Sequence, residues 1–164
     1  MKYEDFVSAF RRQVFSIDFR RQLALAIEIC QRLLPDYINF SEKYKTGDPQ
    51  ILTDAMAMVR SAQSQPADRQ LISRTLSQID KITPDMDDYN SDVLASYALN
   101  TCVAYYNLVE FLADPSPEHI FEIGICLTDT IDLLILAEQA PGTTETDDHP
   151  LMEQTRQYLL KASA

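Results

Sequence analysis

Three carboxylates in the segment 117–140 have the residue type and the spacing of a metal site. Asp129 and Asp132 are three residues apart, so on a helix they lie on neighbouring turns, and Glu122 lies about two turns earlier. Carboxylates arranged in this way can share a divalent cation or raise one another's pKa. A helical magnesium site needs a second such pair, and Glu118 with Glu122 has a different spacing on the same segment. Two interpretations stay open: Glu122, Asp129 and Asp132 bind a metal, or they face solvent or an interface.

A second group of residues that could bind a ligand lies in the segment 91–113. Ser96, Asn100 and Asn107 fall in one stripe of a helix over this segment, with Tyr97 nearby. Exposed helical faces usually carry Lys and Glu, whereas small uncharged polar side chains suit partly buried positions. The stripe therefore indicates either a polar seam whose groups hydrogen-bond across helices or the wall of a small-molecule pocket.

Other catalytic and metal-binding patterns are incomplete in this sequence. The run 88–92 begins like a calcium-binding loop, but Val93 stands where that loop needs Gly and Leu99 where it needs Glu. His119 and Glu122 have the reverse order of the Glu-x-x-His pair of helical di-iron proteins. The three glycines are too few and too scattered for a phosphate-binding loop. We predict no catalytic residues and no cofactor.

The distribution of charge argues against nucleic-acid binding. The formal net charge is −11; residues 1–82 contain 12 Lys and Arg against 10 Asp and Glu, and residues 83–164 contain 2 against 15. Binding to a phosphate backbone requires clustered cations. Because the second half is so acidic, we expect the arginines near the start to pair with acids of the same fold or of a second subunit.

Composition also favours a cytoplasmic protein without a membrane segment. The three cysteines all lie in apolar runs, and an odd number of buried thiols suits a reducing compartment. Acidic residues near Met1 argue against a signal peptide. The most apolar window, Ile120 to Ala137, contains Glu122 and two aspartates, which are costly at bilayer depth.

The positions of the apolar residues predict helices along the whole chain. Two long segments, 91–113 and 117–140, are joined by a three-residue turn, which predicts a central helical hairpin. Pro35 is expected to end an earlier helix because proline lacks an N–H. Further helices are expected at about 3–17, 23–34, 36–45, 49–64, 68–82 and 150–161.

The predicted fold class is all-α. We expect a single-domain multi-helix bundle over 1–164, with about seven or eight helices built on the hairpin 91–140. The polar run 143–149 is expected to be a loose linker before a short C-terminal helix.

A set of short motifs carries a family resemblance. The motifs are Leu34-Pro35-Asp36-Tyr37 with Phe40, Gly47-Asp48, Ile82-Thr83-Pro84-Asp85, Cys102-Val103-Ala104 and Leu108-Val109. In order and spacing they resemble the YjaG-like family of uncharacterised bacterial proteins, and the resemblance extends over about 23–140. It implies an all-helical cytosolic protein of unknown function.

The leading hypothesis from the sequence is a non-enzymatic cytosolic protein that forms a homodimer and contacts a protein partner. Apolar residues occur on nearly all sides of Phe121 to Leu136, which suggests burial by another chain. One alternative is a metal-dependent hydrolase or metal-binding helical protein using Glu122, Asp129 and Asp132. The other is a small-molecule-binding module using the stripe at Ser96.

Overall fold

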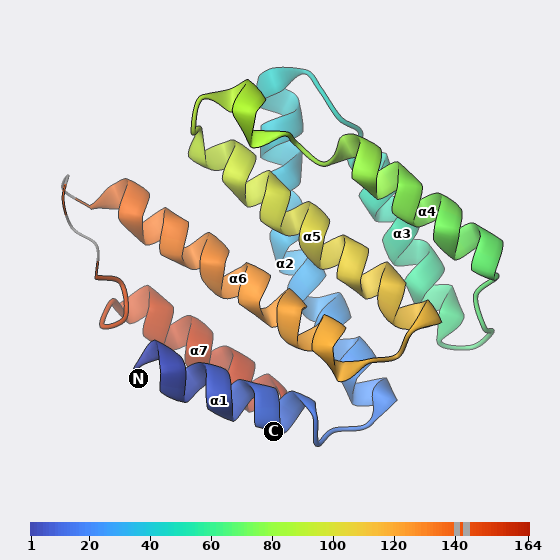
Figure 1. Ribbon diagram of the computed structural model, residues 1–164, viewed down its shortest axis with the longest axis horizontal. Helices are drawn as coiled ribbons and strands as arrows, with labels where there is room; N and C mark the ends of the chain where they lie inside the picture. The colour runs from blue at the N-terminus through green and yellow to red at the C-terminus, as the bar shows by residue number, and fades with distance from the viewer. Residues whose placement is uncertain (140–141, 143–144) are drawn as a thin grey trace.

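Helices α5 (Val93–Ala113) and α6 (Pro117–Glu138) form the antiparallel hairpin at the centre of the computed structural model (Figure 1). The Asp92 side chain caps α5 by accepting a hydrogen bond from the Leu94 amide at 3.0 Å. At the tip, Ser116 caps α6, and Pro117 occupies the first turn, where a missing N–H leaves no helical bond unmade. The structure describes residues 1–139, 142 and 145–164, and it confirms the predicted hairpin over the part it describes.

Five further α-helices in the described residues pack around this hairpin. They are α1 (Tyr3–Val14), α2 (Phe19–Tyr44), α3 (Pro49–Ala62), α4 (Arg69–Ile82) and α7 (Pro150–Ala162), and the 3₁₀ turn η1 (Met86–Tyr89) precedes the hairpin. α2 crosses behind both arms, α3 and α4 pack on α5, and α1 and α7 lie side by side against α6 (Figure 1). The described residues contain no strand, so the predicted all-α, single-domain bundle is confirmed.

The prediction that Pro35 ends a helix is wrong, because α2 continues through it to Tyr44. A proline inside a helix costs about 3 kcal/mol. Tyr37 and Phe40 follow Pro35 and are at most 1% exposed, and burying each such side chain contributes about 1.5–3 kcal/mol. The Thr101 hydroxyl of α5 also lies 3.0 Å from the Leu33 carbonyl oxygen, within hydrogen-bond distance. Burial of these side chains in the core, together with the contact to α5, therefore outweighs the local cost of the proline.

The turn after α2 depends on Gly47 and Tyr37. Gly47 has φ +71°, and a Cβ at this position would lie 2.1 Å from the Tyr37 hydroxyl. That hydroxyl donates a hydrogen bond of 2.9 Å to the Ile82 carbonyl at the end of α4. The glycine thus allows the turn to close over a contact that joins α2 to α4. Asp48 then caps α3 by accepting a hydrogen bond from the Gln50 amide at 3.0 Å.

The apolar surface of α6 is covered mainly by helices of the same chain. α6 packs against α1, α2, α5 and α7. Ile120, Ile123 and Ile135 are at most 1% exposed, and Leu136 is 36% exposed. The apolar residues around α6 therefore need no second chain to bury most of them. None of the helices in the described residues has the length and hydropathy needed to cross a membrane.

The two ends of the chain meet beside α6. The Arg156 side chain of α7 is only 2% exposed, and its guanidinium donates to the Met1 carbonyl at 2.6 Å and to Asp147 at 2.7 Å. Asp147 also accepts from the Tyr3 amide at 3.3 Å. Residues 143 and 144 of the predicted loose linker 143–149 lie outside the described residues. The looseness of this segment stays a prediction.

Candidate functional site

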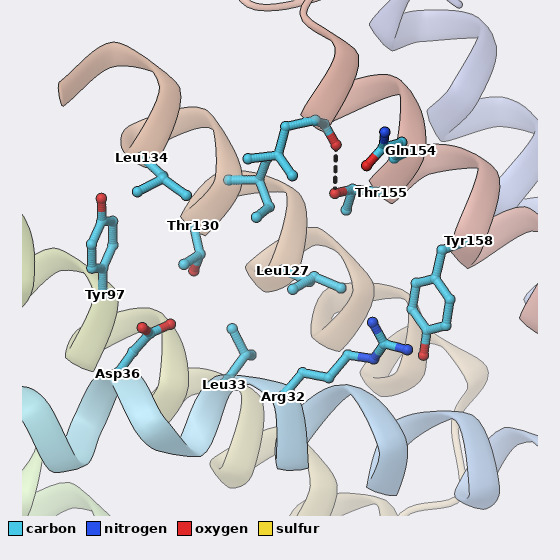
Figure 2. Close-up of a pocket in the computed structure, with 12 residues that line it drawn as sticks. Arg32, Leu33, Asp36, Tyr97, Leu127, Thr130, Leu134, Gln154, Thr155 and Tyr158 are labelled. Atoms are coloured by element: carbon cyan, nitrogen blue, oxygen red, sulfur yellow. Dashed lines mark hydrogen bonds between the residues drawn. The ribbon is translucent and has the colours of Figure 1, made fainter. Parts of the chain in front are cut away.

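A pocket of about 400 Å³ lies between α2, α5, α6 and α7 (Figure 2). This volume falls within the usual range of small-molecule sites, about 300–1,000 Å³. Each of the four helices contributes at least one lining side chain, so the pocket exists only when these four helices are packed together.

The middle of the pocket is apolar. Leu33 of α2 and Leu127 of α6 both lie near its centre, and Leu134 lies further along α6 (Figure 2). Leu33 and Leu127 are 1% and 8% exposed, so they are core residues whose edges form the floor. Such a surface favours the apolar part of a ligand because binding removes that part from water.

One end of the pocket is formed by Arg32 and Tyr158. The guanidinium carbon of Arg32 lies 3.8 Å from the centre of the Tyr158 ring. The guanidinium donates one hydrogen bond, to Glu28 at 3.1 Å, among its five N–H groups. The Tyr158 hydroxyl is buried and has no hydrogen-bond partner in the described part of the chain. Burial, and after it the neighbouring Glu28 carboxylate, raises the pKa of Tyr158 to about 12, so the hydroxyl stays a neutral donor and acceptor.

The opposite end is formed by Asp36, Tyr97 and Thr130. Burial raises the pKa of the half-buried Asp36 carboxyl. Burial also raises the pKa of Tyr97, and the nearby Asp36 charge adds to this effect. In Figure 2, Asp36 and Tyr97 lie on one side of Leu33 and Leu127, and Arg32 and Tyr158 lie on the other. The pocket therefore has an apolar middle between a basic end and an acidic end.

The four predicted ligand-binding residues have different positions. Tyr97 lines the pocket. Asn100 is not a lining residue, but it donates a hydrogen bond of 3.1 Å to the hydroxyl of Thr130, which does line the pocket. Asn107 is paired with the His119 ring at 2.9 Å, near the hairpin tip. Ser96 is half-buried on α5, outside the described lining.

The predicted metal ligands lie along α6 on the side of the two chain ends. Glu122 and Asp129 are exposed, and Asp132 accepts a hydrogen bond from Thr146. Asp129 is exposed as a residue, but neighbouring protein atoms shield its carboxyl group from part of the surrounding water, which raises its pKa, and the charges of Asp132 and Glu122 raise it further. In the described residues, no three His, Cys, Asp or Glu side chains are arranged to hold a metal ion. The geometry thus adds no support to a metal at these three residues.

Sequence reasoning missed the charged residues of the pocket, Arg32 and Asp36. The prediction that Pro35 ends a helix assigned them to separate elements. In the continuous α2 they are four residues apart, one turn along the same face. That spacing was the available signal. Gln154 and Tyr158, which come from α7, had no local signal because only the tertiary fold brings them to α2.

These features define an all-α domain with a small-molecule-sized pocket at the junction of four helices. The chain belongs to the DUF416 family of proteins of unknown function, whose model matches residues 9–161. The resemblance to a family of unknown function is therefore confirmed.

A solved structure supports the fold. A DUF416 family protein from Shewanella baltica OS155 has a TM-score of 0.80 and 23% sequence identity, over 94% of this chain and 83% of that chain. At this identity the likeness shows the fold alone. No curated protein matches the chain.

Proposed function

We propose that this protein binds a small, partly apolar molecule in the pocket between α2, α5, α6 and α7. The carrying observation is the combination of a cavity of about 400 Å³ with an apolar floor and charged side chains at its ends. A few polar groups around an apolar surface are typical of ligand sites, because the apolar part supplies affinity and the polar groups fix orientation. The predicted role of Tyr97 in ligand binding agrees with this proposal.

A polar group at one end of the pocket gives the proposal a second support. Among the described residues, the buried Tyr158 hydroxyl has no hydrogen-bond partner, and an unpaired buried polar group costs about 1–3 kcal/mol. A ligand that hydrogen-bonds this hydroxyl would remove that cost. The Thr130 hydroxyl, in contrast, already donates to the Cys126 carbonyl at 2.8 Å and accepts from Asn100. Asn100 therefore supports the wall of the pocket.

The proposal is tested with 1-anilinonaphthalene-8-sulfonate, a fluorescent probe that has aromatic rings and one anionic group. Leu134 lines the pocket, and Leu133 is the adjacent half-buried leucine outside its lining. Leu134→Trp should fill the cavity, whereas Leu133→Trp adds the same side chain elsewhere on α6. We expect saturable binding of one probe per chain in the native protein and in Leu133→Trp, and a loss of at least about tenfold in Leu134→Trp.

Thermal unfolding of both variants separates blocked binding from a folding defect. If Leu134→Trp melts like Leu133→Trp and loses the probe, the pocket is the site. If both variants bind the probe as the native protein does, or if the native protein shows no saturable binding, the proposal is wrong.

Four finer predictions from the sequence stay predictions. They are the YjaG-like assignment, the cytoplasmic location, the homodimer with a protein partner, and the absence of nucleic-acid binding. A dimer would be tested by sedimentation at micromolar concentration. α6 is covered mainly by its own chain. In the described part of the chain, Leu136 is the large apolar residue that α6 leaves exposed, and other helices expose further ones, such as Phe19 and Leu71.

A further inference from the structure

We infer that the ligand of this pocket is bipolar, with an acid group that pairs with Arg32, an amino group that pairs with Asp36, and an apolar body between them. This inference rests on the proposed function and specifies the ligand class. It follows from the positions of three sets of residues in Figure 2: a cation, a carboxylate, and the leucines that separate them.

The placement of the two charges is fixed by α2. Arg32 and Asp36 are one helical turn apart, yet their side chains point to opposite ends of the pocket (Figure 2). Side chains at this spacing often form an ion pair with each other. Here Arg32 instead pairs with Glu28, one turn in the other direction, at 3.1 Å. Asp36 is thereby left without Arg32 as a partner.

The basic end is organised to receive an anion. The guanidinium of Arg32 is stacked on Tyr158, which restricts the orientation of its plane. One of its N–H groups is used by Glu28, and a carboxylate can accept two hydrogen bonds from an arginine at once. The unpaired Tyr158 hydroxyl beside it can donate a further hydrogen bond to an acid group.

The acidic end is organised to receive a cation. Burial is the cause of the raised pKa of Asp36, and no described residue donates a hydrogen bond that would offset it. A carboxylate that is partly removed from water without a partner is unfavourable, and a bound ammonium group would stabilise it. Tyr97 stands beside Asp36 and can contact the same group.

The test compares three kinds of straight-chain probe. Octanoate carries only the acid group, octylamine carries only the amino group, and ω-amino acids of six, eight and ten carbons carry both. Binding is measured by calorimetry at neutral pH in the full chain. We expect the best of the ω-amino acids to bind at least about tenfold more tightly than octanoate or octylamine, because two charge-assisted contacts replace one.

Two substitutions test which end of the pocket binds the acid group and which end binds the amino group. Arg32→Gln should weaken the ω-amino acid and octanoate about tenfold and leave octylamine unchanged. Asp36→Asn should weaken the ω-amino acid and octylamine to a similar extent and leave octanoate unchanged. Arg74→Gln, on the exposed side of α4, and Glu42→Gln, near the end of α2, make the same changes in net charge away from the pocket. These controls should bind all probes as the native protein does.

The outcomes distinguish this inference from the function on which it rests. If the ω-amino acids bind no better than the single-charge probes, or if the control substitutions have the same effects, the bipolar ligand is wrong. In that case Leu134-dependent binding of the fluorescent probe would still support the pocket. If the native protein shows no saturable binding of the fluorescent probe, the proposed function is wrong, and the bipolar ligand is wrong with it.

Discussion

The Arg32 guanidinium of α2 lies 3.8 Å from the centre of the Tyr158 ring of α7. This stacking contact joins the longest helix of the described residues to the last one and forms one end of the pocket. Its two halves are 126 positions apart in the sequence. The integrity of the pocket therefore depends on how α7 is held against the rest of the bundle, and the first two predictions concern that docking.

Tyr158→Phe and Tyr158→Ala should have different effects on stability. Phenylalanine keeps the ring beneath Arg32 and removes a buried hydroxyl that has no partner, so we expect a change within about 0.5 kcal/mol. Alanine removes the ring and leaves a cavity, so we expect a loss of about 1–3 kcal/mol from a half-buried site. Urea unfolding of both variants measures the difference. Equal losses in the two variants would contradict the role of the ring.

Asp147→Asn should loosen α7 locally. Asp147 pairs at 2.7 Å with Arg156, a side chain that is 2% exposed, and this hydrogen bond lowers the pKa of Asp147. Removing the charge leaves a buried guanidinium without its anion, which should cost about 1.5–3 kcal/mol. Amide hydrogen exchange should become faster in α7 and α1, which the pair connects. Asp148→Asn changes the exposed neighbouring aspartate and should leave exchange in both helices unchanged.

Gly124→Ala should destabilise the protein although alanine favours helices. The helical preference of alanine over glycine is worth about 1 kcal/mol. A Cβ at Gly124, however, would lie 2.3 Å from the Phe10 ring of α1, and overpacking of this kind costs about 1–3 kcal/mol. The contact should outweigh the preference because Phe10 is fully buried and cannot move away easily. A higher melting temperature for Gly124→Ala would show that α1 repacks without strain.

We expect the ionisation of Asp92 to make the free energy of unfolding depend on pH under acidic conditions. Hydrogen bonds from Lys43, at 2.5 Å, and then from Tyr44 and the Leu94 amide lower the pKa of Asp92 to about 2. The folded-state pKa is below the value of about 4 for a free aspartate, so this stabilisation is present above pH 4. It is lost as the pH falls from about 4 to about 2.

Asp92→Asn isolates this charge because asparagine is also a good helix cap. Denaturant unfolding between pH 2 and 7 should show a smaller decrease in acid for the variant than for the native protein. Asp88→Asn, on the exposed 3₁₀ turn η1, is the control. If Asp92→Asn and Asp88→Asn give the same pH profile, the Lys43 and Tyr44 contacts contribute no measurable stability.

The helices and their caps could be predicted because their causes are local. Asp48, Asp68 and Asp92 each accept a hydrogen bond from an amide two residues later, and Pro49 and Pro117 occupy first turns where proline is favoured. In the hairpin, the spacing of the apolar residues likewise predicts which face of each helix is buried. These signals depend only on neighbours in the chain.

The pocket could not be predicted because the residues that line and support it are distant from one another in the sequence. The Asn100 amide bonds Thr130 from the next helix, and Tyr158 meets Arg32 from the far end of the chain. Pro35 also misled the prediction, since the free energy that carries α2 through it comes from the burial of Tyr37 and Phe40 in the tertiary core. The stripe of uncharged polar residues on α5 could be recognised in the sequence, but the residues of other helices that hydrogen-bond to it could not.

The location of a bound probe tests the pocket most directly. The measurement is the set of intermolecular nuclear Overhauser effects between 1-anilinonaphthalene-8-sulfonate and the methyl groups of the native protein. The pocket predicts contacts from the probe to methyls of Leu33, Leu127 and Leu134, with none to Leu133. Contacts only to methyl groups outside the pocket lining, or a bound probe with no contact to these three leucines, would contradict the proposed site.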